Sequence, residues 1–411
     1  MKKILSNRVI TMSESETLAM TRIARELKET GKDVISLSIG EPDFNTPDEV
    51  KEFAKQSIDE NWSHYPPVPG YLELRKAISA KFKRDNNLDY TPEQIVVSTG
   101  AKQSIYQLVM SLVNPGDEVI IPVPYWVSYK EIVKVAEGVP VYITATIEND
   151  FKISAAQLRD AITEKTKMIM FSSPSNPTGM LYSKEELKAI AEVVKDYPHV
   201  ILMADEIYEH INFIGRHESI AQFDFIKEQV VVINGVAKGF AMTGWRIGFI
   251  GAPLPIAKAC SKLQGQVTSA TCSIAQRAAI KAMEMNPNTS QDILNMRETF
   301  RHRRDMVFEL LKEIPCFKVR LPQGAFYFFP DVSELYGKNT PPDSLFAKTY
   351  GRTNIANSDD MCMYLLYDAN VALVQGSAFG DDRCIRLSYA TSDSQLKEAV
   401  RRIKEAVLNL R

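Results

Sequence analysis

The sequence predicts an α/β protein, with a large domain built on a mostly parallel, seven-stranded sheet covered by helices and a smaller α+β domain. Seven short runs of apolar residues lie between residues 94 and 253, and most of them are continuous rather than alternating. Strands that are buried on both faces of a helix-covered sheet have this pattern. Helical patterns separate the runs, and the alternation ends in the last third of the chain, which indicates the smaller domain.

Each predicted strand and helix has its own pattern in the sequence. Strands are expected at residues 94–100, 118–124, 139–146, 167–173, 199–205, 230–236 and 246–253. Helices are expected at 13–30, 101–113, 183–196, 290–314 and 394–410. Gly31 suits the C′ position after the first helix, and Ser183 with Glu186 forms a capping box at the start of the third. The polar residues 337–356 are expected to form a mobile loop.

Length and composition set broad limits on the protein. The 411 residues suffice for two or three domains. We expect an N-terminal arm with part of the small domain at 1–44, the large domain at 45–290 and the small C-terminal domain at 291–411. The net charge of −2 gives no general attraction to nucleic acid or to an anionic membrane.

The cysteines, the histidines and the hydropathy point to a cytoplasmic protein without a metal site. The five cysteines form no CxxC pair, which argues against disulfides and a zinc cluster, and the five histidines lack HExxH spacing. The N-terminus has no signal-like apolar region, and no apolar run approaches the roughly 20 residues that span a bilayer.

Polar residues at the carboxyl ends of the predicted strands indicate a ligand site, because ligands of α/β sheets bind there. Lys238 follows the run VVVINGVA, where burial would lower its pKa, and a neutral lysine amine can form a Schiff base with an aldehyde. Its plain alternative is a solvated loop lysine. Asp205 ends the run VILMAD and would suit a protonated pyridine nitrogen or, equally well, cap a following helix. Tyr208 follows within reach of a phenolic oxygen on the same ring.

Three further segments suit other parts of the same ligand. The Pro-flanked turns of SPSNPTG hold Asn176, whose amide can donate to the phenolic oxygen, although a plain turn is the simpler interpretation. Gly100 precedes a helix that begins at Ala101, and the free N–H groups of a helix start bind phosphate. Arg246 can clamp that phosphate with its guanidinium fork, or form a surface salt bridge.

An aromatic residue and a second arginine complete the set. The indole of Trp126 can stack on a pyridine ring, or pack in the core as most tryptophans do. Arg386 lies in the apolar run CIRLSYAT and needs a carboxylate, either from a substrate or from an acidic side chain. No single residue decides the matter, but together these groups match pyridoxal 5′-phosphate with an amino acid.

Seven motifs then show a resemblance to a known family: GEPDF (40–44), YPPVPG (65–70), PYWVSY (124–129), SPSNPTG (173–179), DEIYEH (205–210), AKGFAMTGWRIG (237–248) and RLSYATS (386–392). From about residue 10 to the C-terminus the chain resembles the class I aminotransferases of pyridoxal-phosphate fold type I, and most of all the bacterial aspartate aminotransferases of the Ib subgroup. The resemblance implies a homodimer with shared active sites.

The resemblance also implies individual roles. Tyr65 would reach the phosphate bound by the partner subunit, and Gly40 would lie beside the substrate. Lys102 would pair with the distal carboxylate of aspartate or glutamate and, like Trp126 and Asn176, would border both cofactor and substrate; its alternative is an exposed lysine in the first turn of a helix. One departure is Gly235, where many relatives carry a phosphate-binding serine, so the phosphate would lose one hydrogen bond.

The expected activity is transfer of the amino group of L-aspartate to 2-oxoglutarate by a ping-pong mechanism, with Lys238, Asp205 and Tyr208 as catalytic residues. Prephenate, aromatic amino acids or alanine are alternative substrates for the same cofactor residues. A carbon–sulfur lyase on the same fold is a second class. A cofactor-binding transcription regulator is a third, disfavoured by the net charge and by the short segment before the first predicted helix.

Overall fold

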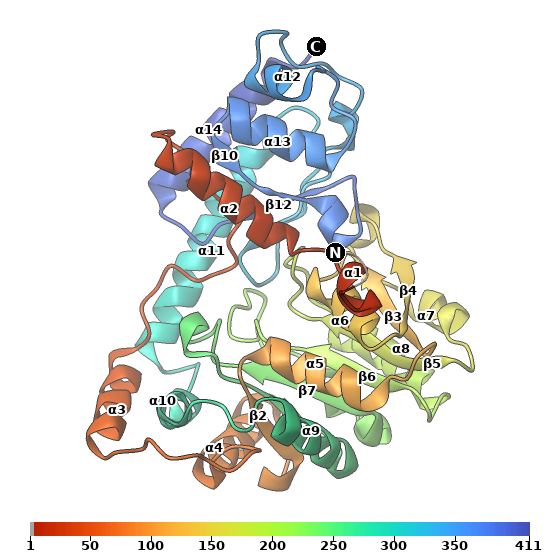
Figure 1. Ribbon diagram of the computed structural model, residues 1–411, viewed down its shortest axis with the longest axis vertical. Helices are drawn as coiled ribbons and strands as arrows, with labels where there is room; N and C mark the ends of the chain where they lie inside the picture. The colour runs from red at the N-terminus through yellow and green to blue at the C-terminus, as the bar shows by residue number, and fades with distance from the viewer. Residues whose placement is uncertain (1–3) are drawn as a thin grey trace.

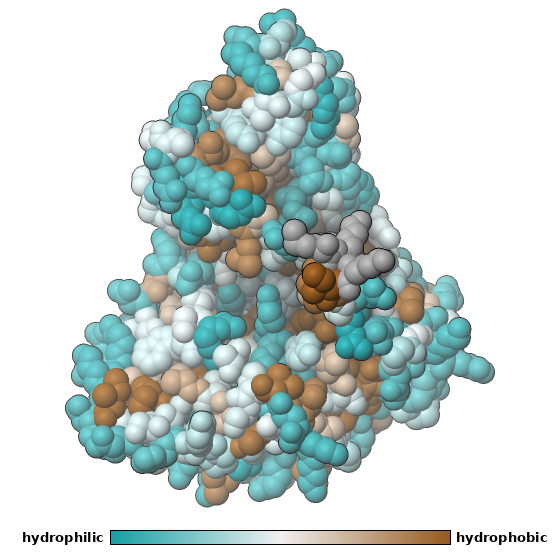
Figure 2. All heavy atoms as spheres, viewed as in Figure 1, coloured by the Kyte–Doolittle hydropathy of each residue, from teal (hydrophilic) through white to brown (hydrophobic). Residues whose placement is uncertain are grey.

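The computed structural model describes residues 4–411. It consists of a sheet covered by helices on both faces and, above it in Figure 1, a smaller group of helices and short strands. Helix α11, Gln291–Lys312, extends alongside both parts and connects them (Figure 1). The space-filling view shows the surface hollowed between the two parts (Figure 2).

The large sheet contains all seven strands that the sequence predicts, in the order β2-β8-β7-β6-β5-β3-β4. Six strands run in one direction, and β8 is antiparallel to both of its neighbours. The predicted fold class is therefore confirmed. The bounds are β2 Ile95–Ser98, β3 Glu118–Val123, β4 Val139–Thr144, β5 Thr166–Ser172, β6 Ile201–Asp205, β7 Val230–Gly235 and β8 Gly248–Gly251.

Helices cover both faces of this sheet, which explains why the strand sequences are continuously apolar. Along β7, Val230 and Val232 pack against helices of one face, whereas Val231 and Ile233 pack against helices of the other. The first face carries α3 Asp48–Asp59, α4 Leu72–Lys81, α7 Ala155–Ala161, α8 Lys184–Lys195 and α10 Ser273–Glu284. The second carries α5 Ala101–Leu112, α6 Ser128–Val135 and α9 Leu254–Val267.

The smaller part has its own core, to which the helix Glu16–Glu29 contributes Met20 and Ala24. Its three-stranded antiparallel sheet has the order β11-β12-β9, and β1 pairs in parallel with β10. The strands are β1 Ile35–Ser36, β9 Tyr327–Phe328, β10 Val371–Ala372, β11 Val374–Gln375 and β12 Ile385–Ser388. Its helices, besides α11, are α2 Glu16–Glu29, α12 Leu345–Tyr350, α13 Ser358–Asp368 and α14 Asp393–Leu408, whereas the short α1 Asn7–Ile10 lies against α6 of the large part (Figure 1).

The five predicted helices are present with ends shifted by a few residues, and two terminal signals act as expected. The hydroxyl of Ser183 accepts from the N–H of Glu186, whose carboxylate accepts from the N–H of Ser183. Gly31 follows α2 with φ of +87°, the conformation that glycine adopts most readily. Within residues 4–411, none of the helices combines the length and the apolar character that crossing a bilayer requires.

The segment 337–356 differs from the irregular loop that its polarity predicts, because it contains helix α12. The Asp368 carboxylate accepts from the N–H groups of Leu345 and Phe346, and the Ser344 hydroxyl caps the same helix. The Phe346 ring is fully buried. Asp368 lies 23 residues after Leu345, so the sequence around α12 carries little sign of this partner.

Candidate active site

A cavity of about 310 Å³ lies between the carboxyl ends of the large sheet and the small domain. It collects ten of the twelve predicted site residues: Gly40, Ala101, Lys102, Trp126, Asn176, Asp205, Tyr208, Lys238, Arg246 and Arg386. Gly100 lies directly behind Arg246. Tyr65 is not in the cavity of its own chain, and its side chain is 96% exposed. Four cationic side chains and one carboxylate line the cavity, so it favours anions.

Lys238 follows β7 and extends into the cavity rather than into a solvated loop. Its ammonium donates to the carbonyl oxygen of Gly40 at 2.5 Å and lies 5.8 Å from the centre of the Tyr208 ring. Burial lowers the pKa of Lys238 to about 8, while the Glu41 carboxylate opposes this and Arg386 and Arg246 add to it. A sizeable fraction of the amine is therefore neutral near pH 8, as attack on an aldehyde requires.

Asp205 is the last residue of β6, and its carboxylate is buried. Tyr129 donates its hydroxyl proton to Oδ2 at 2.8 Å, and the N–H of Ile207 donates to Oδ1 at 3.3 Å. Residues 207–210, which follow Asp205, form a turn rather than a helix, so the helix-cap interpretation is wrong. Burial raises the pKa of Asp205 to about 6, and the two donors counteract it. Within residues 4–411 this carboxylate has no ion-pair partner, which leaves room for a cationic ligand.

Arg386, on β12, is a buried cation without a counter-ion among residues 4–411. Its guanidinium donates to the Asn176 side-chain oxygen at 3.0 Å and to the Ser38 carbonyl at 2.6 Å, and its Nε has no partner. The structural ion pair is therefore not observed. Because a guanidinium only donates, the Asn176 oxygen must face it, and the Asn176 amide group remains free to donate elsewhere.

An anion cradle forms where α5 begins. Gly100 has φ of +83°, and a Cβ atom there would lie 2.4 Å from Nη2 of Arg246. The Arg246 guanidinium donates to the carbonyls of Thr243 at 3.1 Å and Thr99 at 3.4 Å and has no carboxylate partner within residues 4–411. The N–H groups of Ala101 and Lys102, in the first turn, have no acceptor among the same residues. These donors suit a phosphate.

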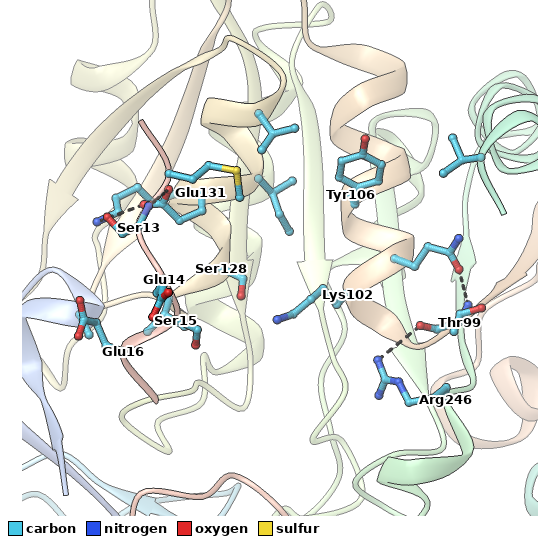
Figure 3. A pocket seen from close by; sticks show the side chains of 18 of the residues that line it. Ser13, Glu14, Ser15, Glu16, Thr99, Lys102, Tyr106, Ser128, Glu131 and Arg246 are labelled. Carbon is cyan, nitrogen blue, oxygen red and sulfur yellow. Dashed lines mark hydrogen bonds and ion pairs between the residues drawn. The ribbon is translucent and has the colours of Figure 1, made fainter. Parts of the chain in front are cut away.

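Lys102 and Trp126 lie at the mouth of the cavity. The Lys102 ammonium is 4.9 Å from the centre of the Trp126 ring. Desolvation in the pocket lowers the pKa of Lys102, and the positive charge of Arg246 lowers it further. Figure 3 shows Lys102 and Arg246 beside a larger hollow of about 810 Å³, which continues outward from the cavity and is walled by residues 12–16. Trp126 is half-buried, so its ring is available to the cavity rather than enclosed in the core.

Two buried tyrosines were missed by the sequence interpretation. Tyr129 holds Asp205, and the hydroxyl of Tyr327 lies 2.8 Å from that of Tyr208. Tyr129 lies three residues after Trp126 in PYWVSY, so that motif offered a signal. Tyr327 lies in the aromatic run GAFYFF, which is indistinguishable from ordinary core sequence.

The fold and this cavity define an enzyme that works on amino acids with a bound aldehyde cofactor. The model for aminotransferase classes I and II matches residues 32–403. An aspartate aminotransferase from Bacillus sp. strain YM-2 is 46% identical over 99% of this chain and 100% of its own. A bifunctional aspartate and glutamate/aspartate-prephenate aminotransferase from Petunia hybrida is 44% identical, over 99% of this chain and 83% of its own.

The crystal structure of the Rhizobium meliloti aspartate aminotransferase has a TM-score of 0.93 and 41% identity, over 99% of both chains. The chain belongs to the class I and II aminotransferase family. It is an aminotransferase that depends on pyridoxal 5′-phosphate, and the site fits this cofactor. Within residues 4–411 the buried Asp205 carboxylate has no cation, and the N–H groups of the cradle beside Arg246 have no acceptor. The Lys238 amine has a lowered pKa. Pyridoxal phosphate would supply a partner for each of these groups.

Proposed function

We propose that the protein transfers the amino group of L-aspartate to 2-oxoglutarate, giving oxaloacetate and L-glutamate, by a ping-pong mechanism. The observation that carries this proposal is Arg386, a residue only 2% exposed whose guanidinium has no carboxylate partner within residues 4–411. A buried cation left unpaired is costly, so a substrate α-carboxylate is its natural partner. Lys102, exposed at the mouth, is a second cation without a carboxylate partner within residues 4–411, and two cations suit a dicarboxylate.

The cofactor would be held along the floor of the cavity. Bound pyridoxal phosphate supplies an aldehyde that bonds amines and a ring that withdraws electrons from them. Lys238 would bond the aldehyde and Asp205 would face the ring nitrogen. The remaining contacts come from Tyr208 and Asn176 at the phenolic oxygen, Trp126 over the ring, and Gly100, Ala101, Lys102 and Arg246 around the phosphate.

The chain's own residues then orient the substrate and move its proton. Arg386 holds the α-carboxylate, Lys102 holds the distal carboxylate, and Gly40 leaves space beside the substrate. Nζ of Lys238, once free of the cofactor, accepts the proton from Cα of the amino acid, and returns one later in the half-reaction. Its pKa of about 8 suits both directions of this transfer near neutral pH.

The assembly is part of the same proposal: a homodimer in which Tyr65 serves the phosphate of the neighbouring subunit. Its support is the Tyr65 side chain, which is 96% exposed although the resemblance assigns it to a phosphate site. The division at residues 44/45 and 290/291 is also proposed, supported by the start of α11 at Gln291. Five free cysteines support a reducing, cytoplasmic location.

Prephenate is a second candidate amino acceptor, and aromatic amino acids and alanine are further candidate substrates. The hollow of about 810 Å³ beside Lys102 has room for a larger side chain than that of aspartate. The name of the Petunia relative includes prephenate, which adds support. A carbon–sulfur lyase has no comparable support, because no feature of the cavity favours a sulfur leaving group over a second carboxylate.

A substrate panel with purified holoenzyme tests the proposal. Rates with aspartate and 2-oxoglutarate should exceed those with phenylalanine or alanine by at least about tenfold, because Lys102, which has no carboxylate partner within residues 4–411, disfavours uncharged side chains. Lys102→Ala should raise KM for aspartate by roughly 10- to 100-fold and leave KM for alanine within about twofold. Lys188→Ala, at an exposed position of α8, is the matched control. An equal effect of Lys102→Ala on both substrates would refute the aspartate assignment.

A further inference from the structure

Tyr327 faces Tyr208 across the cavity floor, with the two hydroxyl oxygens 2.8 Å apart and both side chains buried. Tyr327 lies on β9, which pairs with β12, the strand that carries Arg386. Tyr208 follows β6 of the large sheet, three residues after Asp205. This hydrogen bond therefore joins the strand that would bind the substrate carboxylate to the segment that would face the cofactor ring.

Proton counting restricts how this pair can work. Each phenol has a single proton, and within residues 4–411 neither hydroxyl has another hydrogen-bond partner. If Tyr208 donated to Tyr327, Tyr208 would have no proton left for the cofactor. If Tyr327 is the donor, the Tyr208 proton is free for a third oxygen. The proposed contact between Tyr208 and the ring oxygen thus requires Tyr327 to donate.

The surroundings of Tyr327 favour the donor role. The Arg386 guanidinium lies 4.6 Å from the centre of the Tyr327 ring, and a cation over the ring withdraws electron density from the phenol. A more polarised O–H is a stronger donor, and chains of hydrogen bonds strengthen one another in a buried site. Burial raises the pKa of Tyr327, and Arg386 is the largest influence that opposes it.

The position of the hydroxyl is also closely restricted. A Cβ atom at Gly40 would lie 2.4 Å from the Tyr327 hydroxyl oxygen, so the phenol occupies the space that any other residue at 40 would need. The carbonyl of the same glycine accepts from Lys238. Tyr327 therefore contacts the Gly40 segment, whose carbonyl accepts from Lys238. Because it also contacts Tyr208 and Arg386, it lies where all three groups meet.

We propose that Tyr327 is a positioning residue of the reaction: its hydroxyl donates to Tyr208 and thereby commits the single Tyr208 proton to the phenolic oxygen of the cofactor, while its ring supports Arg386. This proposal rests on the proposed function, because it needs a cofactor that Lys238 bonds and Tyr208 touches. It adds a donor chain, from Tyr327 through Tyr208 to the cofactor, that depends on the contact between the two domains.

Tyr327→Phe tests the donor chain, because it removes the hydroxyl and keeps the ring over Arg386. The readout is a spectrophotometric pH titration of the bound cofactor in the holoenzyme. Loss of a donor weakens the Tyr208 hydrogen bond to the deprotonated ring oxygen, so the apparent pKa of the chromophore should rise by about half a unit to one unit. The KM for aspartate should stay within about twofold, whereas Tyr327→Leu should raise it roughly fivefold or more.

Tyr389→Phe is the matched control, because it removes a buried hydroxyl of the same core that bonds only the Ala325 carbonyl. It should lower Tm about as much as Tyr327→Phe and leave the chromophore pKa unchanged. In a Tyr208→Phe background, Tyr327→Phe should have no further effect on that pKa. An unchanged or lowered pKa in Tyr327→Phe, or an effect that persists without the Tyr208 hydroxyl, overturns the donor chain. A wild-type protein with no titrating chromophore overturns the proposed function itself.

Discussion

At the residue scale, burial shifts the two titratable groups of the cavity in opposite directions. It lowers the pKa of Lys238 to about 8 and raises that of Asp205 to about 6, because both groups lose water around their charged forms. The amine thus becomes a usable nucleophile near neutral pH. The carboxylate, in contrast, is left in need of a cation, which the protonated ring of the cofactor would supply.

Attachment of pyridoxal phosphate to the apoprotein should reflect the pKa of Lys238. Only the neutral amine attacks an aldehyde, so the attachment rate should rise with pH around a midpoint near 8. Glu41→Gln should shift this midpoint downward, because the Glu41 carboxylate favours the ammonium. Stopped-flow absorbance at a series of pH values measures both. Glu52→Gln, on the exposed face of α3, should leave the midpoint unchanged; a midpoint near 10 in the wild type would contradict the burial of Lys238.

Replacement of Asp205 by asparagine should stabilise the apoprotein while it damages the enzyme. The pKa of Asp205 is about 6 in the folded protein and has an ordinary value of 3.8. Between these two pH values the folded protein binds more protons than the unfolded chain, so its stability falls as pH rises from one to the other. Asp205→Asn removes that loss and should raise the free energy of unfolding by about 1–3 kcal/mol at pH 7.5 and by little at pH 4. Urea unfolding of apoprotein at the two pH values measures this, and kcat should fall at least about 100-fold. Equal stability of the two proteins at pH 7.5 would argue against a desolvated carboxylate.

At the element scale, strands β7 and β8 lie so close together behind the cavity that position 235 has no space for a side chain. A Cβ atom at Gly235 would lie 2.7 Å from the Ile247 carbonyl oxygen and 3.0 Å from Cα of Gly248. Backbone atoms cannot give way as a flexible side chain can, so this chain has no space for the phosphate-binding serine that the resemblance leads us to expect there.

Gly235→Ser should therefore destabilise the protein rather than improve cofactor binding. Overpacking between two paired strands should lower the free energy of unfolding by about 1–3 kcal/mol, and the Kd for pyridoxal phosphate should stay the same or rise. Gly265→Ser is the control, because a Cβ atom there meets only ordinary contacts with Val68. Tighter cofactor binding in Gly235→Ser would show that the strands separate easily and that the missing hydroxyl matters more than the packing.

At the scale of the whole molecule, the position of Tyr65 predicts that each active site needs two chains. In a hybrid dimer of Lys238→Ala with Tyr65→Ala, one site has both lesions and the other has neither, if Tyr65 acts across the interface. Such hybrids should regain about half of the wild-type activity per dimer at a cofactor concentration where the Tyr65→Ala homodimer is inactive. If Tyr65 acts within its own chain, every site keeps a lesion, and no activity returns. Titration of one variant into the other distinguishes the two cases.

Much of the fold can be predicted from the sequence, because a strand that is buried on both faces has a continuous run of apolar residues. The runs around Val230 to Ile233 show it, since alternate residues enter two different cores. The antiparallel direction of β8 could not be predicted in this way, because an apolar run has the same composition in either direction. Helix α12 was missed for a related reason, since its first turn is capped by Asp368 from a distant part of the chain.

The sequence by itself determined which chemical groups are available to the site: the amine of Lys238, the carboxylate of Asp205, the amide of Asn176 and the guanidinium of Arg386. Only the tertiary structure decided their partners. Within residues 4–411 it left Arg386 without a counter-ion and placed its guanidinium against Asn176, 210 residues earlier in the chain. It also joined Tyr327 to Tyr208. The physical reason is that desolvation and hydrogen bonding depend on contacts between segments far apart in the chain, whereas strand patterns and turns depend on neighbours along it.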